Sequence, residues 1–339
     1  MDIIPLRSPR YEIETTAASG ELSAALELTI DSTLRYTIVK NCTAGQTVVF
    51  EISELARDYL QTPQMWNIAG SPAVYANSTQ IEISRSIKFY SAVNAGGSLV
   101  RTETQTYNGF DGYGEWTEGA NSEIPKGATN AFLLTKLDGS TYEFFAPAST
   151  ILRITATDAN DDITNISNIT SGSSDSTYIY RSSTLNIKVV DCSRYTPTAV
   201  YFVNKFGGIQ PLFFFTKKVD VLNTSSETFQ RNIIDTSTTT PSYFRPAVAT
   251  YPSYPHSIET YNKNGKKSYT LSSGYYPERA NAYFEQLLLS EAVWIIIDNI
   301  PIPVTVRSSS LTFKNSLNDK LVDYTIDFEE AQDFINNVR

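Results

Sequence analysis

The chain has 339 residues, of which 41% are hydrophobic and 19% are charged. These proportions are typical of a folded globular protein, and the length is sufficient for two domains that each bury a core. The 27 basic and 36 acidic residues give a net charge of −9. Direct binding to nucleic acid or to an anionic membrane is not expected, because both partners require a basic surface. The one basic cluster, at residues 263–267, is predicted to be an exposed turn.

The sequence offers few residues that could bind a metal or a nucleotide. His256 is the only histidine, and Cys42 and Cys192 lie far apart, so no zinc site of three or four His/Cys ligands is expected. Acidic residues after Asp158 begin like a calcium loop, but Ile163 stands where that loop needs Gly. No glycine-rich phosphate-binding motif occurs. The sequence therefore predicts neither a cofactor nor a metal.

The two cysteines are predicted to be buried thiols, with a single disulfide between them as the alternative. The N-terminal residues do not follow the pattern of a signal peptide, and no apolar run is long enough to cross a bilayer. A soluble protein without an export signal is therefore expected.

In the N-terminal half, apolar and polar residues alternate, which is typical of half-buried β-strands. Leu26, Leu28 and Ile30 show this alternation, and residues 34–38 repeat it after a break at residues 31–32. Further strands are expected at residues 81–83, 87–89, 132–134, 142–145, 152–154 and 185–189. Ser, Asn and Gly cluster between these segments, and these residues favour loops.

Three segments carry apolar residues at helical spacing. The first spans residues 52–60, with Ser53 placed to cap it. The second spans residues 280–288 and follows Pro277, a residue suited to a first helical turn. The third, residues 331–338, is expected to form a short closing helix.

The predicted fold class is mainly β with a few helices, in two domains. An N-terminal β-sandwich-like domain is expected at residues 1–194, with a long polar loop at residues 158–176. A C-terminal α+β domain is expected at residues 195–339, beginning with a hairpin around residues 204–208. Its later strands are predicted at residues 292–297, 302–313 and 321–328, the last one with Val322, Tyr324, Ile326 and Phe328 facing the helices and Asp323, Thr325 and Asp327 facing solvent or a neighbour.

Residues 107–116 combine carboxylates with aromatic residues and glycines. Asp111 and Glu115 are the type of pair that glycoside hydrolases use, and aromatic rings stack on sugars. Three hypotheses stand for this segment: catalysis, carbohydrate binding, and a protein contact or structural loop. The last is favoured, because loops rich in glycine and aromatic residues more often contact protein or fold onto their own domain.

Aromatic residues are abundant, with 21 Tyr and 17 Phe in the chain. Most are expected to fill β cores, but residues 241–256 carry aromatic side chains together with four prolines, which favours contact with a partner. Without a serine-nucleophile motif, the histidine in this stretch is not predicted to be catalytic. The residues expected in protein contacts are Tyr107, Phe110, Tyr113, Trp116, Tyr243, Phe244, Tyr251, Tyr254 and His256.

Several segments of the C-terminal half carry a family resemblance, as does ISELARDYL at residues 52–60. They are YTPTAVYFVNKFGG at residues 195–208, FFFTKK at 213–218, SGYYPER at 273–279, QLLLSEAVWI at 286–295 and LNDKLVDYTIDFE at 317–329. By these segments the chain resembles virion structural proteins of tailed bacteriophages, of the neck, tail or baseplate type.

The resemblance implies a non-enzymatic, cofactor-free subunit of a ring or connector. It also implies a homo-oligomer in contact with other phage structural proteins, located in the virion after assembly in the host cytoplasm. The alternative is a carbohydrate- or receptor-binding module on the virion periphery.

Overall fold

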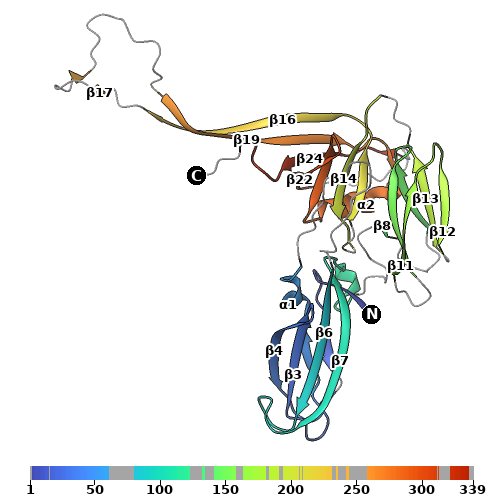
Figure 1. The fold of residues 1–339 in the computed structure, drawn as a ribbon, viewed down its shortest axis with the longest axis vertical. Helices are drawn as coiled ribbons and strands as arrows, with labels where there is room; N and C mark the ends of the chain where they lie inside the picture. The colour runs from blue at the N-terminus through green and yellow to red at the C-terminus, as the bar shows by residue number, and fades with distance from the viewer. Residues whose placement is uncertain are drawn as a thin grey trace, which may run out of the picture.

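The structure is a computed structural model, and the ranges that it describes are residues 2–14, 16–60, 80–122, 132–133, 141–157, 163–180, 183–190, 194–205, 207, 209–230, 234–235, 242–243, 258–310, 312 and 321–335. The fold is mainly β, as the sequence predicts. Figure 1 shows an N-terminal unit, a C-terminal body above it with small sheets beside that body, and a long two-stranded ribbon that projects from the body. None of the described helices is long and apolar enough to span a membrane.

The N-terminal unit is built on a five-stranded sheet with the order β1-β7-β6-β3-β4. Only the β1–β7 pair is parallel; the other neighbours are antiparallel. In a separate antiparallel pair, β2 lies beside β5, and β5 contributes Val48 and Phe50 to the same hydrophobic core. The strands are β1 (Asp2–Pro5), β2 (Tyr11–Glu14), β3 (Ser23–Ile30), β4 (Thr33–Asn41), β5 (Val48–Glu51), β6 (Gln80–Tyr90) and β7 (Leu99–Phe110).

Strand β3 confirms the predicted alternation. Leu26, Leu28 and Ile30 are buried, whereas Glu27 and Thr29 between them are only partly buried. Each buried Leu or Ile contributes about 1.5–3 kcal/mol relative to an exposed one. The predicted strand at residues 34–38 belongs to β4, which lies at the sheet edge and is largely exposed, because no further strand covers it.

The first predicted helix is shorter than expected, and its cap is different. Helix α1 covers Ser53–Arg57, so Ser53 is its first residue, and Ile52 holds the N-cap position without a side-chain hydrogen bond. The predicted capping role of Ser53 is therefore wrong. The carboxylate of Glu51 instead accepts hydrogen bonds from the backbone N–H groups of Ser53 (2.9 Å) and Glu54 (3.1 Å). These bonds satisfy amide groups that lack partners inside the helix.

Two three-stranded sheets occupy the middle of the chain, with the orders β11-β10-β8 and β12-β13-β9. Strand β11 lies inside the predicted polar loop at residues 158–176, so that prediction is wrong at residues 163–170, whereas residues 158–162 lie outside the described residues. Its Thr and Asn residues are stabilised in a strand by antiparallel pairing with β10, which a local reading of the sequence does not reveal. The strands are β8 (Phe132–Leu133), β9 (Thr141–Ala146), β10 (Ile151–Thr157), β11 (Ile163–Thr170), β12 (Ser176–Tyr180) and β13 (Ser183–Val189).

The hydrophobic cores do not divide at the predicted boundary between residues 194 and 195. One core contains buried residues of the range 4–107. The other joins Phe144 and Ala146 of β9 and Leu185 and Ile187 of β13 to buried residues of the range 200–328. Strands β9 and β13 therefore pack with the C-terminal body, and grouping them with the N-terminal domain is a prediction that the core contacts correct.

The C-terminal body contains a seven-stranded sheet with the order β15-β14-β21-β22-β24-β19-β16. The predicted hairpin is confirmed, because β14 and β15 pair antiparallel on either side of residues 204–208. The strand predicted at residues 302–313 is shorter and ends at Val306. The elements are β14 (Thr198–Val203), β15 (Ile209–Phe214), β16 (Lys218–Gln230), β19 (Ile258–Ser272), α2 (Asn281–Leu288), β21 (Val293–Ile297), β22 (Ile300–Val306) and β24 (Thr325–Glu330), with two small pairs, β17 (Ile234–Asp235) with β18 (Ser242–Tyr243) and β20 (Tyr276–Pro277) with β23 (Leu321–Val322).

Helix α2 confirms the second predicted helix and supplies the centre of this core. The ring of Phe284 is fully buried and contacts Phe214, Tyr276 and Tyr324, at 4.7 Å between ring centroids for Tyr324. The predicted facing of the last strand is also confirmed where side chains are described: Tyr324, Ile326 and Phe328 are buried, whereas Asp323, Thr325 and Asp327 are exposed.

The predicted closing helix is wrong where the structure describes it. Residues 331–335 form bends and no helix, and residues 336–338 lie outside the described residues. The backbone N–H of Phe334 donates to the carbonyl of Gly265 in β19 (2.7 Å). Tertiary hydrogen bonds to β19 thus replace the intrahelical bonds that the apolar spacing predicts.

Candidate interaction surfaces

The two-stranded ribbon is the most unusual feature of the fold, and its residues 217–230 and 258–267 are called the arm below (Figure 1). Strand β16 pairs with β19 from Lys218↔Leu271 to Gln230↔Ile258, with one register shift after Glu227. All side chains of β16 except that of Val219 are exposed. The basic cluster at residues 263–267 lies inside β19, so the prediction of a turn is wrong. Its Asn-Gly pair suggests a turn only while the pairing with β16 is unknown.

Polar pairs and one glycine hold the arm together. Asn223 donates to Ser268 (2.6 Å) and Asn262 donates to Glu227 (3.3 Å), both across the ribbon. A Cβ at Gly265 would lie 3.1 Å from the Asn223 carbonyl oxygen and 3.2 Å from the Leu222 side chain. Glycine therefore allows Leu222 to lie across β19.

The arm also exposes apolar side chains, and none of its described residues belongs to the hydrophobic cores of the unit or the body. Phe229 and Tyr261 lie 6.1 Å apart between ring centroids, toward the far end of the ribbon. A two-stranded ribbon is at best marginally stable in water, so contact with another surface would stabilise it. The exposed apolar residues and their exposed fractions are Val221 45%, Leu222 50%, Phe229 46%, Ile258 60% and Tyr261 54%.

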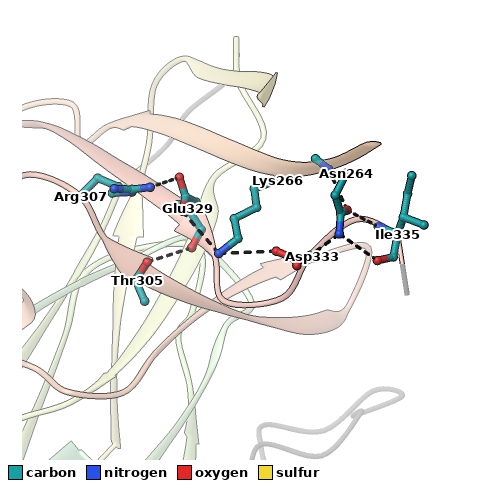
Figure 2. Close-up of polar contacts among 8 residues, drawn as sticks. Asn264, Lys266, Thr305, Arg307, Glu329, Asp333 and Ile335 are labelled. Carbon is teal, nitrogen blue, oxygen red and sulfur yellow. Dashed lines mark hydrogen bonds and ion pairs between the residues drawn. The ribbon is translucent and has the colours of Figure 1, made fainter. Parts of the chain in front are cut away.

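The base of the arm is held by charged and polar contacts to neighbouring strands (Figure 2). Lys266 of β19 lies 3.6 Å from the Asp333 carboxylate and 3.9 Å from that of Glu329 in β24. Arg307 forms an ion pair with the same Glu329. The hydroxyl of Thr305 donates to the Glu329 backbone carbonyl (3.4 Å). These contacts tie the exit of the arm to the sheet.

Residues 331–335, called the C-terminal strap below, run beside the base of the arm. The Asn264 side chain accepts from the Ile335 N–H (3.1 Å) and donates to the Ile335 carbonyl (3.3 Å), as a neighbouring strand would. Lys267 lies over the Phe334 ring, 5.2 Å from its centroid. The strap thereby occupies the outer edge of β19 next to Gly265.

The segment 107–116 has a different environment from the one predicted. Tyr107 and Phe110 are fully buried, so their expected contact with another protein is wrong for the structure described. The Tyr107 hydroxyl donates to Glu12 (2.8 Å) within the N-terminal unit. In a sequence, apolar and aromatic residues at the end of a strand are equally compatible with a buried core and with a protein interface. Only the packing in the structure distinguishes the two.

The N-terminal unit contacts the C-terminal body near Tyr113, and we call this region of contact the joint. Trp116 lies close to it in the sequence but has a different environment. The Tyr113 N–H donates to the Lys205 carbonyl of the body (2.8 Å), and burial raises the pKa of the Tyr113 phenol to about 12. Trp116 begins a 3-10 turn, Trp116–Glu118, and its side chain is 96% exposed. Of the four predicted contact residues in this segment, Trp116 is therefore the one that faces solvent.

Glu115, one of the two carboxylates that suggested catalysis, lies at the joint together with Glu118. Glu115 and Glu118 both pair with Lys205, at 2.8 and 2.9 Å. Burial raises the pKa of the Asp111 carboxyl to about 6; the charge of Glu291 acts in the same direction, and those of Arg7 and Arg57 oppose it. Arg7 and Arg57 of the N-terminal unit also pair with Glu291 of the body (3.4 and 2.7 Å). The joint is thus a network of alternating charges, which spacing along the sequence could not show.

The remaining predicted residues are placed only in part. Tyr243 lies in β18, opposite Ile234, and Phe244, Tyr251, Tyr254 and His256 lie outside the described residues. Cys42 is a buried free thiol, as predicted, and burial raises its pKa; Cys192 lies outside the described residues. Within the described part of the chain, no group of three or more His, Cys, Asp and Glu side chains could hold a metal ion.

Comparisons with known proteins add no identity. No protein-family model matches the sequence, and no match was found among curated proteins or among solved structures.

Proposed function

We propose that this chain is a non-enzymatic structural subunit of a tailed-phage virion, of the neck, tail or baseplate type, and that it forms part of a ring or connector through protein–protein contacts. The arm carries this proposal. It projects from a well-packed body, exposes nearly all side chains of β16, and presents the half-exposed rings of Phe229 and Tyr261. A subunit that binds its neighbours needs such a surface.

In isolation, the arm is expected to be only marginally stable. Two paired strands satisfy only half of their backbone hydrogen-bonding groups, and β16 is the last strand of its sheet. No other described strand pairs with its outer edge, so that edge is open to strand addition. Neighbouring subunits can cover such an edge by strand addition, and head-to-tail contacts of this kind close into rings when the rotation permits.

The test is to shorten the arm without disturbing its base. Residues 228–261 are replaced by Asn-Gly, which joins Glu227 to Asn262, a pair already in register, through a two-residue turn. We expect the variant to remain folded by circular dichroism and to be lost from phage particles. Trp116→Ala, at an exposed residue outside the arm, is the matched control and should be incorporated normally.

Immunogold electron microscopy of virions then gives the position of the full-length chain. Label at the neck, tail or baseplate supports the proposal. Absence of the chain from intact and disrupted particles, or normal incorporation of the shortened variant, contradicts it.

A carbohydrate- or receptor-binding module at the virion periphery is the second candidate, and the exposure of Trp116 favours it. An exposed indole can stack on a sugar ring. The expected result under this alternative is glycan-array binding that Trp116→Ala abolishes while assembly is unchanged. An array without binding by the native chain removes the alternative.

A further inference from the structure

The contacts described at the joint are mainly polar, although the N-terminal unit and the C-terminal body each have a hydrophobic core. Arg7 donates through Nη2 to the Leu289 carbonyl (3.1 Å), and the Tyr113 N–H donates to the Lys205 carbonyl (2.8 Å). The described core clusters each draw their buried residues from one side of the joint. Polar contacts of this kind between two cores permit relative motion, because they hold domains together less firmly than a shared apolar core does.

Asp111 follows directly after β7 and lies against the body. A Cβ at Gly207 of the body would lie 3.1 Å from the Asp111 backbone nitrogen and 3.0 Å from the Cβ of Phe110. The absence of a side chain at Gly207 therefore lets the body approach the end of β7 closely. The charge of Glu291, also of the body, acts on the Asp111 carboxyl. Separation of the two units would thus bring this carboxyl into water.

Two carboxylates, Asp111 of the unit and Glu291 of the body, share the same two arginines. Arg7 and Arg57 pair with Glu291 at 3.4 and 2.7 Å, and their charges also act on Asp111. The Arg7 Nη1 atom is buried and has no hydrogen-bond partner among the described residues. Ionised Asp111 repels Glu291 and competes with it for these arginines. Ionisation therefore weakens the bridge between the units, whereas the neutral carboxyl leaves the bridge intact.

The remaining charged groups at the joint act at some distance from this bridge. Lys205 pairs with Glu115 and Glu118 across the joint, and the charge of Glu285 acts on the Tyr113 phenol. None of these contacts involves Asp111. A variant that changes Asp111 alone therefore separates its effect from theirs.

We propose that the joint is a proton-controlled hinge, which is closed while Asp111 is neutral and opens more readily, with both units folded, once Asp111 is ionised. The orientation of the arm-bearing body relative to the N-terminal unit would then depend on pH. Burial raises the pKa of Asp111 to about 6 in the closed joint, and opening should return it to near 3.9. Closure is therefore penalised from about pH 4 upward and fully above about pH 6.

Hydrogen exchange at the Tyr113 amide reports on the joint directly, because this N–H donates across it to Lys205. The exchange of the full-length chain is measured by mass spectrometry at pH 5, 6 and 7 and corrected for the intrinsic rate at each pH. From the two pKa values, the protection of Tyr113 should fall about tenfold between pH 5 and pH 7. Amides of β3 should remain far better protected than Tyr113 at every pH, since the joint opens without unfolding.

Three variants complete the experiment. Asp111→Asn should keep the protection of Tyr113 constant with pH, and it retains His256, the only histidine, so any effect of that group would persist. Asp220→Asn, at an exposed carboxylate of the arm, is the matched control and should show the native fall. Gly207→Ala should lower the protection of Tyr113 at every pH, because its Cβ forces the joint apart.

The outcomes decide the proposal without reference to virion assembly. A fall in the native chain and in Asp220→Asn that is absent from Asp111→Asn supports the hinge. Protection of Tyr113 that is constant in the native chain, or a fall that persists in Asp111→Asn, overturns it. Protection of Tyr113 equal to that of β3 also overturns it, because the joint would then open only when the whole chain unfolds.

Discussion

The core around α2 and the arm both contain pairs of aromatic residues, but these are buried in the core and partly exposed in the arm. Phe284 is surrounded by the rings of Phe214, Tyr276 and Tyr324, and it is fully buried. Phe229 pairs with one ring, Tyr261, and about half of its surface is exposed. The first arrangement stabilises the chain by itself. The second leaves apolar area exposed, where another surface can bind it. The same residue type therefore stabilises a core or offers a contact, depending on the side chains around it.

Truncation of the two phenylalanines should give the largest difference in stability between the core and the arm. Phe284→Ala removes a fully buried ring and is expected to cost about 3–5 kcal/mol of unfolding free energy, because it leaves a cavity. Phe229→Ala is the matched control and should cost less than about 1 kcal/mol, since its ring is partly in water. Urea unfolding followed by circular dichroism measures both. Similar losses for the two variants would show that the arm is packed in the isolated chain.

Asp111 tests whether the joint responds to pH in a way that the arm does not. Its folded pKa of about 6 lies above the unfolded value near 3.9, so the folded state holds the proton more tightly. The buried charge therefore costs nothing below about pH 4 and its full amount, roughly 1–3 kcal/mol, above about pH 6. Asp111→Asn should remove this cost.

The expected result is that Asp111→Asn matches the native chain in stability at pH 4 and exceeds it at pH 7. Urea unfolding at pH 4, 5, 6 and 7 measures the difference. Glu54→Gln, at an exposed carboxylate of α1, provides the control. A constant difference across the range would mean that Asp111 is not the group that titrates.

Asn264 offers the smallest and most local effect. Asn264→Ala removes the side-chain bonds to Ile335 and should cost about 1 kcal/mol, in line with a pair of partly exposed hydrogen bonds. Hydrogen exchange should accelerate at Phe334 and Ile335 and remain unchanged in α2. Asn262→Ala, farther along the same strand, should leave the strap protected. Equal protection of the strap in both variants would assign its position to the Lys266–Asp333 ion pair instead.

Local pattern predicted the elements whose partners lie nearby in the sequence. The alternation at Leu26, Leu28 and Ile30, the β14–β15 hairpin and helix α2 were all predictable, because their hydrophobic period matches their secondary structure. The candidate surfaces were only partly predictable. Residues 107–116 were singled out as a contact segment, but the packing shows that they form an internal joint and leave Trp116 exposed.

The errors have a common physical origin in long-range pairing. The basic cluster at residues 263–267 became strand because β16 lies beside it, and β11 formed within a polar stretch because β10 pairs with it. The strap at residues 331–335 has apolar residues at helical spacing, but it forms hydrogen bonds to Asn264 and Gly265 instead of a helix. By itself, the sequence determined the mainly β class, the acidic charge and the core-facing residues, which depend on composition and period. Only the tertiary structure decided the arm, the joint and the division of the cores, because each requires residues far apart in the chain to satisfy one another's backbone and charge.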